Sequence, residues 1–151
     1  MEQRSTYAPL RNPTFRNLWS ATLVSNLGGL IQGVGAGWLM TSLTTSESLV
    51  ALVQASNALP IMVFSRVAGA LADSFNRRRI LLVAQGLMLV ASAVLAVFAW
   101  QGWLTPWSLL GFTFLIGCGT ALYNPSWQAS MGDIVPRADL PNAVSLNSMG
   151  F

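Results

Sequence analysis

Long apolar runs, separated by short polar segments, dominate this sequence. Four of these runs occupy residues 18–43, 49–72, 80–100 and 106–127, and a fifth begins at residue 141. A helix needs about twenty predominantly apolar residues to cross a bilayer, so each of the first four is long enough. Only 9% of the residues are charged, against roughly one quarter in a soluble domain. We therefore predict an all-α integral membrane protein with four transmembrane helices and the start of a fifth.

The positive charges indicate how these helices are oriented. All 8 cations are Arg, and most of them lie in residues 1–17, in residues 77–79 and at Arg137. The segments 44–48 and 101–105 contain none. Because cytoplasmic loops carry the excess of positive charge, the N-terminal tail (1–17) is predicted to be cytoplasmic, in a multi-pass protein of the cell (inner) membrane. The sparse, clustered cations do not fit a nucleic-acid surface.

Polar and small residues gather on one face of the first and fourth runs. In the first run, Ser25, Gly29, Gln32, Gly33 and Gly37 share a face, with Asn26 beside them. The glycines predict close packing of another helix. Polar side chains at membrane depth face the bundle or a water-filled cavity, so Asn26 and Gln32 are expected to bond to a neighbouring helix or, less commonly, to contact a substrate. In the fourth run, Thr113, Gly117, Thr120 and Asn124 share a face.

Several local signals predict how individual helices begin or bend. Pro60, in the middle of the second run, removes the bond to the Ser56 carbonyl and predicts a kink. Thr105 followed by Pro106 is typical of a helix start, with a capping residue and then Pro at the first position. The segment 15–19, which contains Phe15 and Trp19, is predicted to place its aromatic side chains at headgroup depth.

The segment from Gly69 to Arg79 joins the second and third runs and reads Gly-Ala-Leu-Ala-Asp-Ser-Phe-Asn-Arg-Arg-Arg. Asp73 lies near the C-terminal end of a helix, where the dipole disfavours a carboxylate by about 0.3–1 kcal/mol. It is therefore expected to have a partner, either in the Arg77 cluster, at another helix N-terminus or in Arg66. Asn76 can tolerate the left-handed conformation that a tight reversal needs, as Gly would. Gly69 is expected to allow close approach of a second helix.

This segment resembles the signature loop between helices 2 and 3 of the major facilitator superfamily, written G-x-L-A-D-R/K-x-G-R/K-R/K. The matching positions are Gly69, Leu71, Ala72, Asp73, Arg77 and Arg78. Ser74 replaces a basic residue and Asn76 replaces a glycine. Further resemblance extends over residues 15–19, 25–28, 37–39 and 140–144, and the acid or amide before the arginines is similar to the enterobactin-exporter-like branch.

The resemblance implies a twelve-helix fold of which this chain is an N-terminal piece, with the missing C-terminal half as its partner. It implies secondary-active export of a small molecule, drug-like or siderophore-like, by alternating access within the lipid bilayer. The implied gating residues are Gly69, Leu71, Asp73, Arg77, Arg78 and Asp133, with Asp133 near the Arg77 cluster. The candidate cavity residues are Asn26, Gln32, Thr113, Thr120 and Asn124. The intramembrane Arg that many members carry in helix 4 is absent here. Proton coupling needs a titratable group within the membrane, and helices 1, 3 and 4 offer none, so if export is driven by protons the titrating residue is expected beyond Phe151.

No nucleophile with its base, phosphate-binding loop or metal-ligand cluster occurs in the sequence. We therefore predict neither an enzyme nor a cofactor, and a single Cys118 within an apolar run is expected to pack as a small apolar residue. Two other classes remain as alternatives. A small four-helix dimeric transporter, similar to the small multidrug resistance family, would need an acid in the middle of helix 1, where this chain has Asn26 and Gln32. A non-transporting membrane scaffold would use the small-residue faces only for packing.

Overall fold

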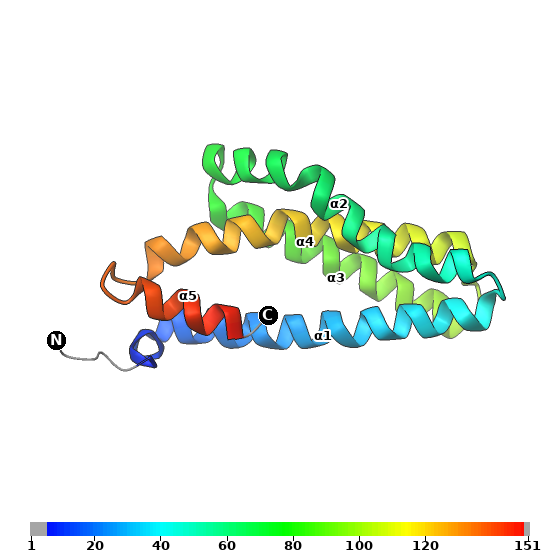
Figure 1. Cartoon of the computed structure of the whole chain (residues 1–151), viewed down its shortest axis with the longest axis horizontal. Helices are drawn as coiled ribbons and strands as arrows, with labels where there is room; N and C mark the ends of the chain where they lie inside the picture. Colours follow the sequence, from blue (N-terminus) through cyan, green and yellow to red (C-terminus); the bar gives the residue numbers. More distant parts are fainter. Residues whose placement is uncertain (1–5, 150–151) are drawn as a thin grey trace. The chain divides into compact units, whose positions relative to one another are not determined.

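The structure, a computed structural model, describes residues 6–149, and within that range it consists of helices, turns and short connections without a strand. A short 3-10 helix, η1 (Ala8–Arg11), precedes five α-helices. These are α1 (Pro13–Leu43), α2 (Glu47–Ser74), α3 (Arg77–Gln101), α4 (Pro106–Ile134) and α5 (Leu140–Met149), labelled in Figure 1. The prediction of an all-α protein is confirmed.

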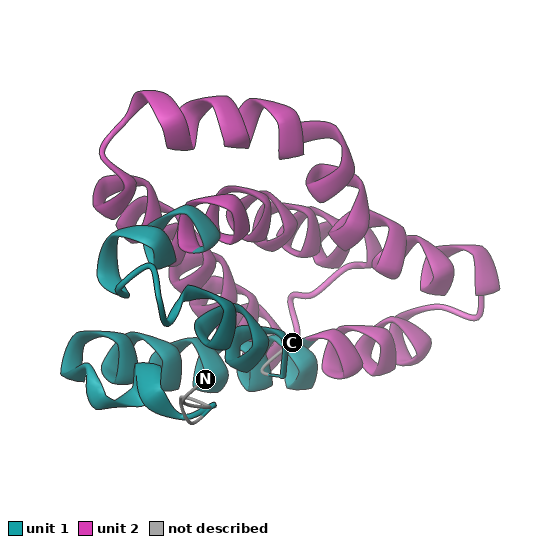
Figure 2. Ribbon diagram, turned by 60° about the vertical axis from the view of Figure 1, so that its left-hand side comes forward, with its two compact units in different colours: residues 1–32, 128–151 teal, residues 33–127 magenta. Residues whose placement is uncertain are grey.

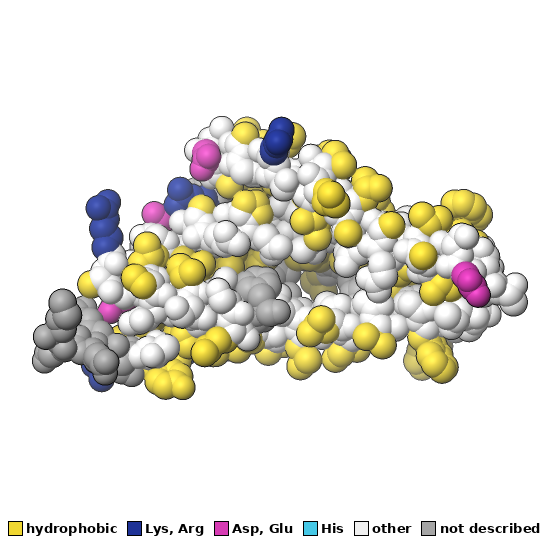
Figure 3. All heavy atoms as spheres, in the orientation of Figure 1, with side chains coloured by type: hydrophobic (Ala, Val, Ile, Leu, Met, Phe, Trp, Pro, Cys, Tyr) yellow, Lys and Arg dark blue, Asp and Glu magenta, His cyan; other side chains and the backbone are white. Residues whose placement is uncertain are grey.

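Three of these helices are both long and apolar enough to cross a membrane, namely α2, α3 and α4. α1 is longer than any of them at 31 residues, but its glycines and its Ser, Asn and Gln side chains make it less apolar. Its membrane crossing stays a prediction. Large hydrophobic side chains are exposed along these helices, including Trp38 at 77%, Met62 at 78% and Leu89 at 71%. Figure 3 shows such side chains over much of one face, where charged side chains are few. Lipid is the solvent in which this exposure is favourable.

Of the first four helix starts, three differ from the predicted ones: α2 begins at Glu47 rather than at residue 49, and the other two follow an asparagine that caps the helix. α1 begins at Pro13 rather than at residue 18, after Asn12, and α3 begins at Arg77 rather than at residue 80, after Asn76. At its other end α4 runs through Pro125 to Ile134, beyond the predicted residue 127. The start of α4 at Pro106 is as predicted: the Thr105 hydroxyl accepts a bond from the Ser108 N–H at 3.2 Å, and Ser108 Oγ accepts one from the Thr105 N–H at 2.9 Å. This reciprocal pair is a capping-box arrangement.

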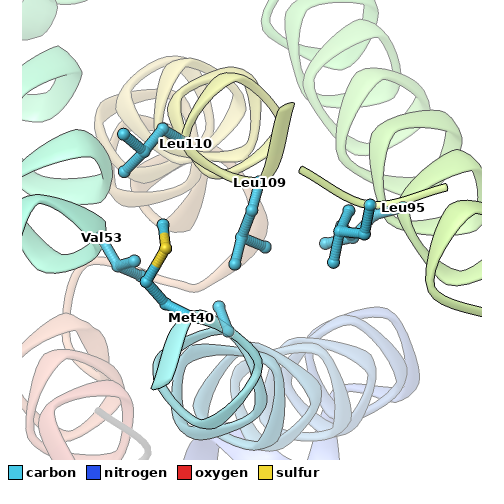
Figure 4. Packing of buried hydrophobic residues seen from close by; sticks show 7 residues of the cluster. Met40, Val53, Leu95, Leu109 and Leu110 are labelled. Carbon is cyan, nitrogen blue, oxygen red and sulfur yellow. The ribbon is translucent and has the colours of Figure 1, made fainter. Parts of the chain in front are cut away.

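Two compact units make up the chain, and they are coloured separately in Figure 2. Unit 1 comprises residues 1–32 and 128–151, and unit 2 comprises residues 33–127. The hydrophobic core of unit 2 draws on four helices, as Figure 4 shows: Met40 comes from α1, Val53 from α2, Leu95 from α3, and Leu109 and Leu110 from α4. Met40 and Leu109 are completely buried. This core therefore holds together the end of unit 2 where α1 leads into α2 and α3 leads into α4.

Two further residues, Pro60 and Gly102, shape helices of unit 2. α2 contains Pro60 near its middle, and Figures 1 and 2 both show the helix changing direction along its length. α3 ends at Gln101 and is capped by Gly102, whose φ of 71° is left-handed and whose N–H donates to the Ala99 carbonyl at 3.4 Å. The N–H of Trp103 donates to the Phe98 carbonyl at 3.0 Å, and the two rings meet edge to face at 6.1 Å. These bonds and this apolar contact form a Schellman motif.

Candidate transport and gating sites

The segment between α2 and α3 turns without a left-handed residue. Asn76 has φ −63° and ψ 112°, which is extended backbone. Its side-chain oxygen accepts a bond from the Arg78 N–H at 3.0 Å, and its carbonyl accepts one from the Arg79 N–H at 2.9 Å. Asn76 therefore does not use the left-handed conformation that it could tolerate. Asn76 is the N-cap of α3, and among the described residues only Gly102 has a positive φ.

The charges around this turn oppose the helix dipoles. Asp73 carries a negative charge in the last turn of α2, which is the negative end of the α2 dipole. The first turn of α3 is the positive end of the α3 dipole, and it contains Arg77, Arg78 and Arg79. Each such placement costs about 0.3–1 kcal/mol at an exposed position. Arg78, Arg79 and Asp73 are exposed and Arg77 is half-buried. These charges therefore do not stabilise the helices that carry them.

Asp73 makes no hydrogen bond or ion pair with any residue of the described range 6–149. The expected pairing of Asp73 with Arg66 or with the Arg77 cluster is therefore not formed in this structure. Gly69, expected to allow close approach of a helix, would have no heavy atom within 4 Å of an added Cβ. Asp133 lies exposed in the last turn of α4, and its implied contact with the Arg77 cluster stays a prediction.

Two of the candidate cavity residues, Thr113 and Thr120, use their hydroxyls within α4. Thr113 is buried and donates to the Leu109 carbonyl at 2.8 Å. Thr120 is half-buried, donates to the Ile116 carbonyl at 3.0 Å, and lies 3.6 Å from the sulfur of Met88. Since a hydroxyl has a single proton, what each can still offer a substrate is lone pairs. Asn26, Gln32 and Asn124 are half-buried side chains of α1 and α4.

Close helix packing occurs at two glycines of α4. A Cβ added to Gly117 would lie 2.5 Å from the carbonyl oxygen of Asn57 and 3.1 Å from Pro60 Cγ, so α4 rests on the backbone of α2 beside the proline. A Cβ added to Gly119 would collide with the Met88 side chain and lie 3.2 Å from the Ala84 carbonyl of α3. Gly117 and Gly119 thus hold α4 in the angle between α2 and α3.

The glycines of α1 are not packed in this way. Cβ atoms added to Gly29, Gly33 and Gly37 would each have nothing within 4 Å among the described residues. Close packing of a helix on this ridge is not formed within either unit and stays a prediction. Spacing alone does not separate the glycines of α1 from Gly117, because both sets recur on one helical face.

The beginning of α1 contacts the end of α4 and α5 within unit 1. The side-chain nitrogen of Asn12 donates to the Ile134 carbonyl at 3.0 Å, and the indole nitrogen of Trp19 donates to the Leu146 carbonyl at 3.3 Å. Phe15 has 0% exposure. Phe15 therefore packs inside the protein instead of facing headgroups, and Trp19 directs its N–H to the protein. Asn12 was not among the sequence candidates, although Pro13 after it is a signal for a cap.

With this geometry described, comparison with known proteins identifies the chain. Residues 4–151 match the family model MFS_3, described as transmembrane secretion effector. The chain belongs to this family. The signature segment, which resembles that of the major facilitator superfamily, agrees with this family, and α2, α3 and α4 are long and apolar enough to cross a membrane. The narrower enterobactin-exporter-like branch stays a prediction.

Curated relatives of this MFS_3 chain are efflux and transport proteins. It is 26% identical over 141 residues to macrolide efflux protein A of Streptococcus pyogenes, covering 91% of this chain and 35% of that protein. It is 25% identical to the staphyloferrin A transporter of Staphylococcus aureus, with coverages of 86% and 33%. It is 28% identical to the multidrug efflux pump Tap of Mycobacterium tuberculosis, with coverages of 85% and 30%. The chain thus spans about a third of the length of these relatives. No solved structure matches it.

Proposed function

We propose that this chain forms the first helices of a secondary-active exporter of small, amphipathic organic molecules, and that it works together with further helices of the kind its longer relatives contain. The observation that carries the proposal is the match of residues 4–151 to a transmembrane secretion family, joined by relatives that export macrolides and other drugs. A cytoplasmic N-terminus and the cell membrane as location belong to the same proposal.

Within unit 2, a weakly polar face of α4 supports this proposal. Within unit 2, α4 is fixed to α2 and α3 through Gly117 and Gly119. Thr113 and Thr120 have their protons bonded within the helix. A weakly polar wall of this kind suits drug-like substrates better than strongly charged ones, because it offers acceptors and apolar surface but no formal charge. Asn124, also in unit 2, would add an amide group to this wall, and Asn26 and Gln32 of unit 1 stay candidates from the sequence.

The gating role of Asp73, Arg77, Arg78 and Asp133 is part of the proposal. Asp73 and Arg78 sit at unfavourable helix ends and are exposed. Such charges gain stability once a partner of opposite charge or another helix terminus meets them. We propose that the missing C-terminal half supplies contacts to them in one state of the transport cycle and withdraws from them in the other, which would make them a latch.

The test is export by the protein at its native length, with its intact mass measured from its own membranes. Reconstituted vesicles are loaded with erythromycin as the macrolide probe or ethidium as the drug probe, and efflux is followed with and without an imposed proton gradient. Gradient-dependent efflux of either probe is the expected result. No efflux of either probe, from vesicles in which the protein is folded, would contradict drug export and favour a scaffold. A native mass near 16.2 kDa would contradict the need for further helices.

A further inference from the structure

Asn12 bonds to two helices at once. Its side-chain oxygen accepts from the Thr14 N–H at 3.0 Å and from the Phe15 N–H at 3.4 Å, which caps α1. Its side-chain nitrogen donates to the carbonyl of Ile134, the last residue of α4, at 3.0 Å. An amide can do both because it carries an acceptor oxygen and a donor nitrogen on separate atoms, whereas a carboxylate can only accept.

The beginning of α1 and the end of α4, to which Asn12 bonds, both need a hydrogen-bonding partner. The first N–H groups of α1 and the last carbonyls of α4 have no partners inside their own helices. Phe15, which follows the cap, is completely buried, and Val135, which follows Ile134, is 4% exposed. An unpaired backbone group beside such residues is costly, because water is largely excluded. The bond from Asn12 therefore fixes the end of α4 to the beginning of α1.

A second bond continues this connection to α5. The indole nitrogen of Trp19, about two turns into α1, donates to the Leu146 carbonyl of α5. α5 also packs against η1, the short helix that leads to Asn12. Figures 1 and 2 both show α5 beside the first turns of α1. Asn12, which caps α1, and Trp19 within α1 thus hold two other helices by their backbone carbonyls.

We infer that Asn12 is a positioning residue that joins the beginning of α1 and the end of α4 into one moving body. The inference rests on the proposed function, because it concerns how the predicted cytoplasmic ends of two cavity-lining helices move during export. Residues 8–12 are then a working part of the transporter and not a passive tail. The bond acts by preventing the two helix ends from separating when the cavity opens and closes.

Two substitutions separate the bond from Asn12 to the Ile134 carbonyl, which we call the tie, from the cap that Asn12 forms on α1. Asn12→Asp keeps an oxygen that caps α1 but has no donor for Ile134, and Trp19→Phe removes only the second donor. Asn17→Asp is the matched control, because Asn17 is exposed on α1 and its side chain makes no hydrogen bond within the described residues. All variants are made in the native-length protein with Cys118 replaced by Ala, and spin labels are placed at the exposed positions Arg16 and Arg137.

Asn12→Asp should broaden the distribution of distances between the two labels and lower the maximal rate of ethidium export by about fivefold or more, with KM changed by less than about twofold. Asn17→Asp should leave both unchanged. Distances and rates for Asn12→Asp that equal those of Asn17→Asp would overturn the tie. Broader distances with an unchanged rate would overturn its role in transport. If Asn12→Asp does not fold, Trp19→Phe with the same two readouts decides. A parent that exports nothing refutes the proposed function, while the distances still decide whether the tie exists.

Discussion

Gly117 of α4 lies against the backbone of Asn57 of α2, so closely that a methyl group at Gly117 would stand 2.5 Å from the Asn57 carbonyl oxygen. Pro60, which interrupts the hydrogen bonding of α2, is 3.1 Å from the same point. The bent part of α2 and the middle of α4 therefore meet with only backbone and the Pro60 ring at the contact. This contact fixes the angle at which α4 crosses α2 inside unit 2.

Gly117→Ala should destabilise the protein. The added methyl group must displace backbone, for which overpacking costs about 1–3 kcal/mol, and this exceeds the gain of up to about 1 kcal/mol in helix propensity. The free energy of unfolding, from titration with SDS in mixed micelles, measures the change. Gly111→Ala is the control, since Gly111 is in the same helix and has open space around it. Equal stability of the two variants would show that the helices part easily at Gly117.

Gly102→Ala should also destabilise, for a different reason. Space around Gly102 is open, but its φ of 71° is left-handed, and a Cβ there costs about 1 kcal/mol or more. The Schellman bond of Trp103 and the contact between Trp103 and Phe98 would weaken with it. The same unfolding titration measures the loss, and Gly86→Ala in α3 serves as the control. A Gly102→Ala protein as stable as the Gly86→Ala protein would argue against the left-handed turn.

The sequence was sufficient to predict the helices but not their contacts. The apolar runs predicted all five helices because membrane helices need length and hydropathy that few other structures share. The cap at Thr105 and the kink at Pro60 followed from local rules that need no neighbour. The N-cap role of Asn76 was missed because asparagine favours both the left-handed conformation and the cap, and the following arginines do not decide between them.

In the candidate site, too, the helical faces could be predicted from the sequence but the contacts could not. The face of Thr113, Gly117 and Thr120 was recognisable from helical spacing, yet spacing could not show that Gly117 is packed while Gly29 is open. That difference depends on where a second helix lies. The bond from Asn12 to Ile134 joins residues 122 positions apart, and no local pattern reports a contact over such a distance. Pro13 alone indicated that Asn12 caps a helix.

Substitutions of Asn76 distinguish its two possible roles. As an N-cap, Asn76 should tolerate Ser or Asp with little change, lose about 1 kcal/mol as Ala, and lose only a few tenths as Gly. A left-handed residue would behave otherwise, with Gly stabilising and Ser destabilising. The unfolding free energies of the four variants, measured in one detergent, provide the comparison. Gly as the most stable of them would contradict the observed cap.

Asp73→Asn should lower export while leaving folding intact. The carboxylate lies at the negative end of α2 without a partner among the described residues, so removing its charge should raise the stability of that helix by a few tenths of a kcal/mol. If Asp73 is a latch in the native-length transporter, the maximal rate of ethidium export should fall by about fivefold or more. A change of this size corresponds to a typical coupling free energy. Glu47→Gln makes the same chemical change at the other, exposed end of α2 and should not alter the rate. Because stability and transport are expected to change in opposite directions, a misfolded variant cannot imitate the result. Normal export by the Asp73→Asn protein, at wild-type expression, would defeat the latch.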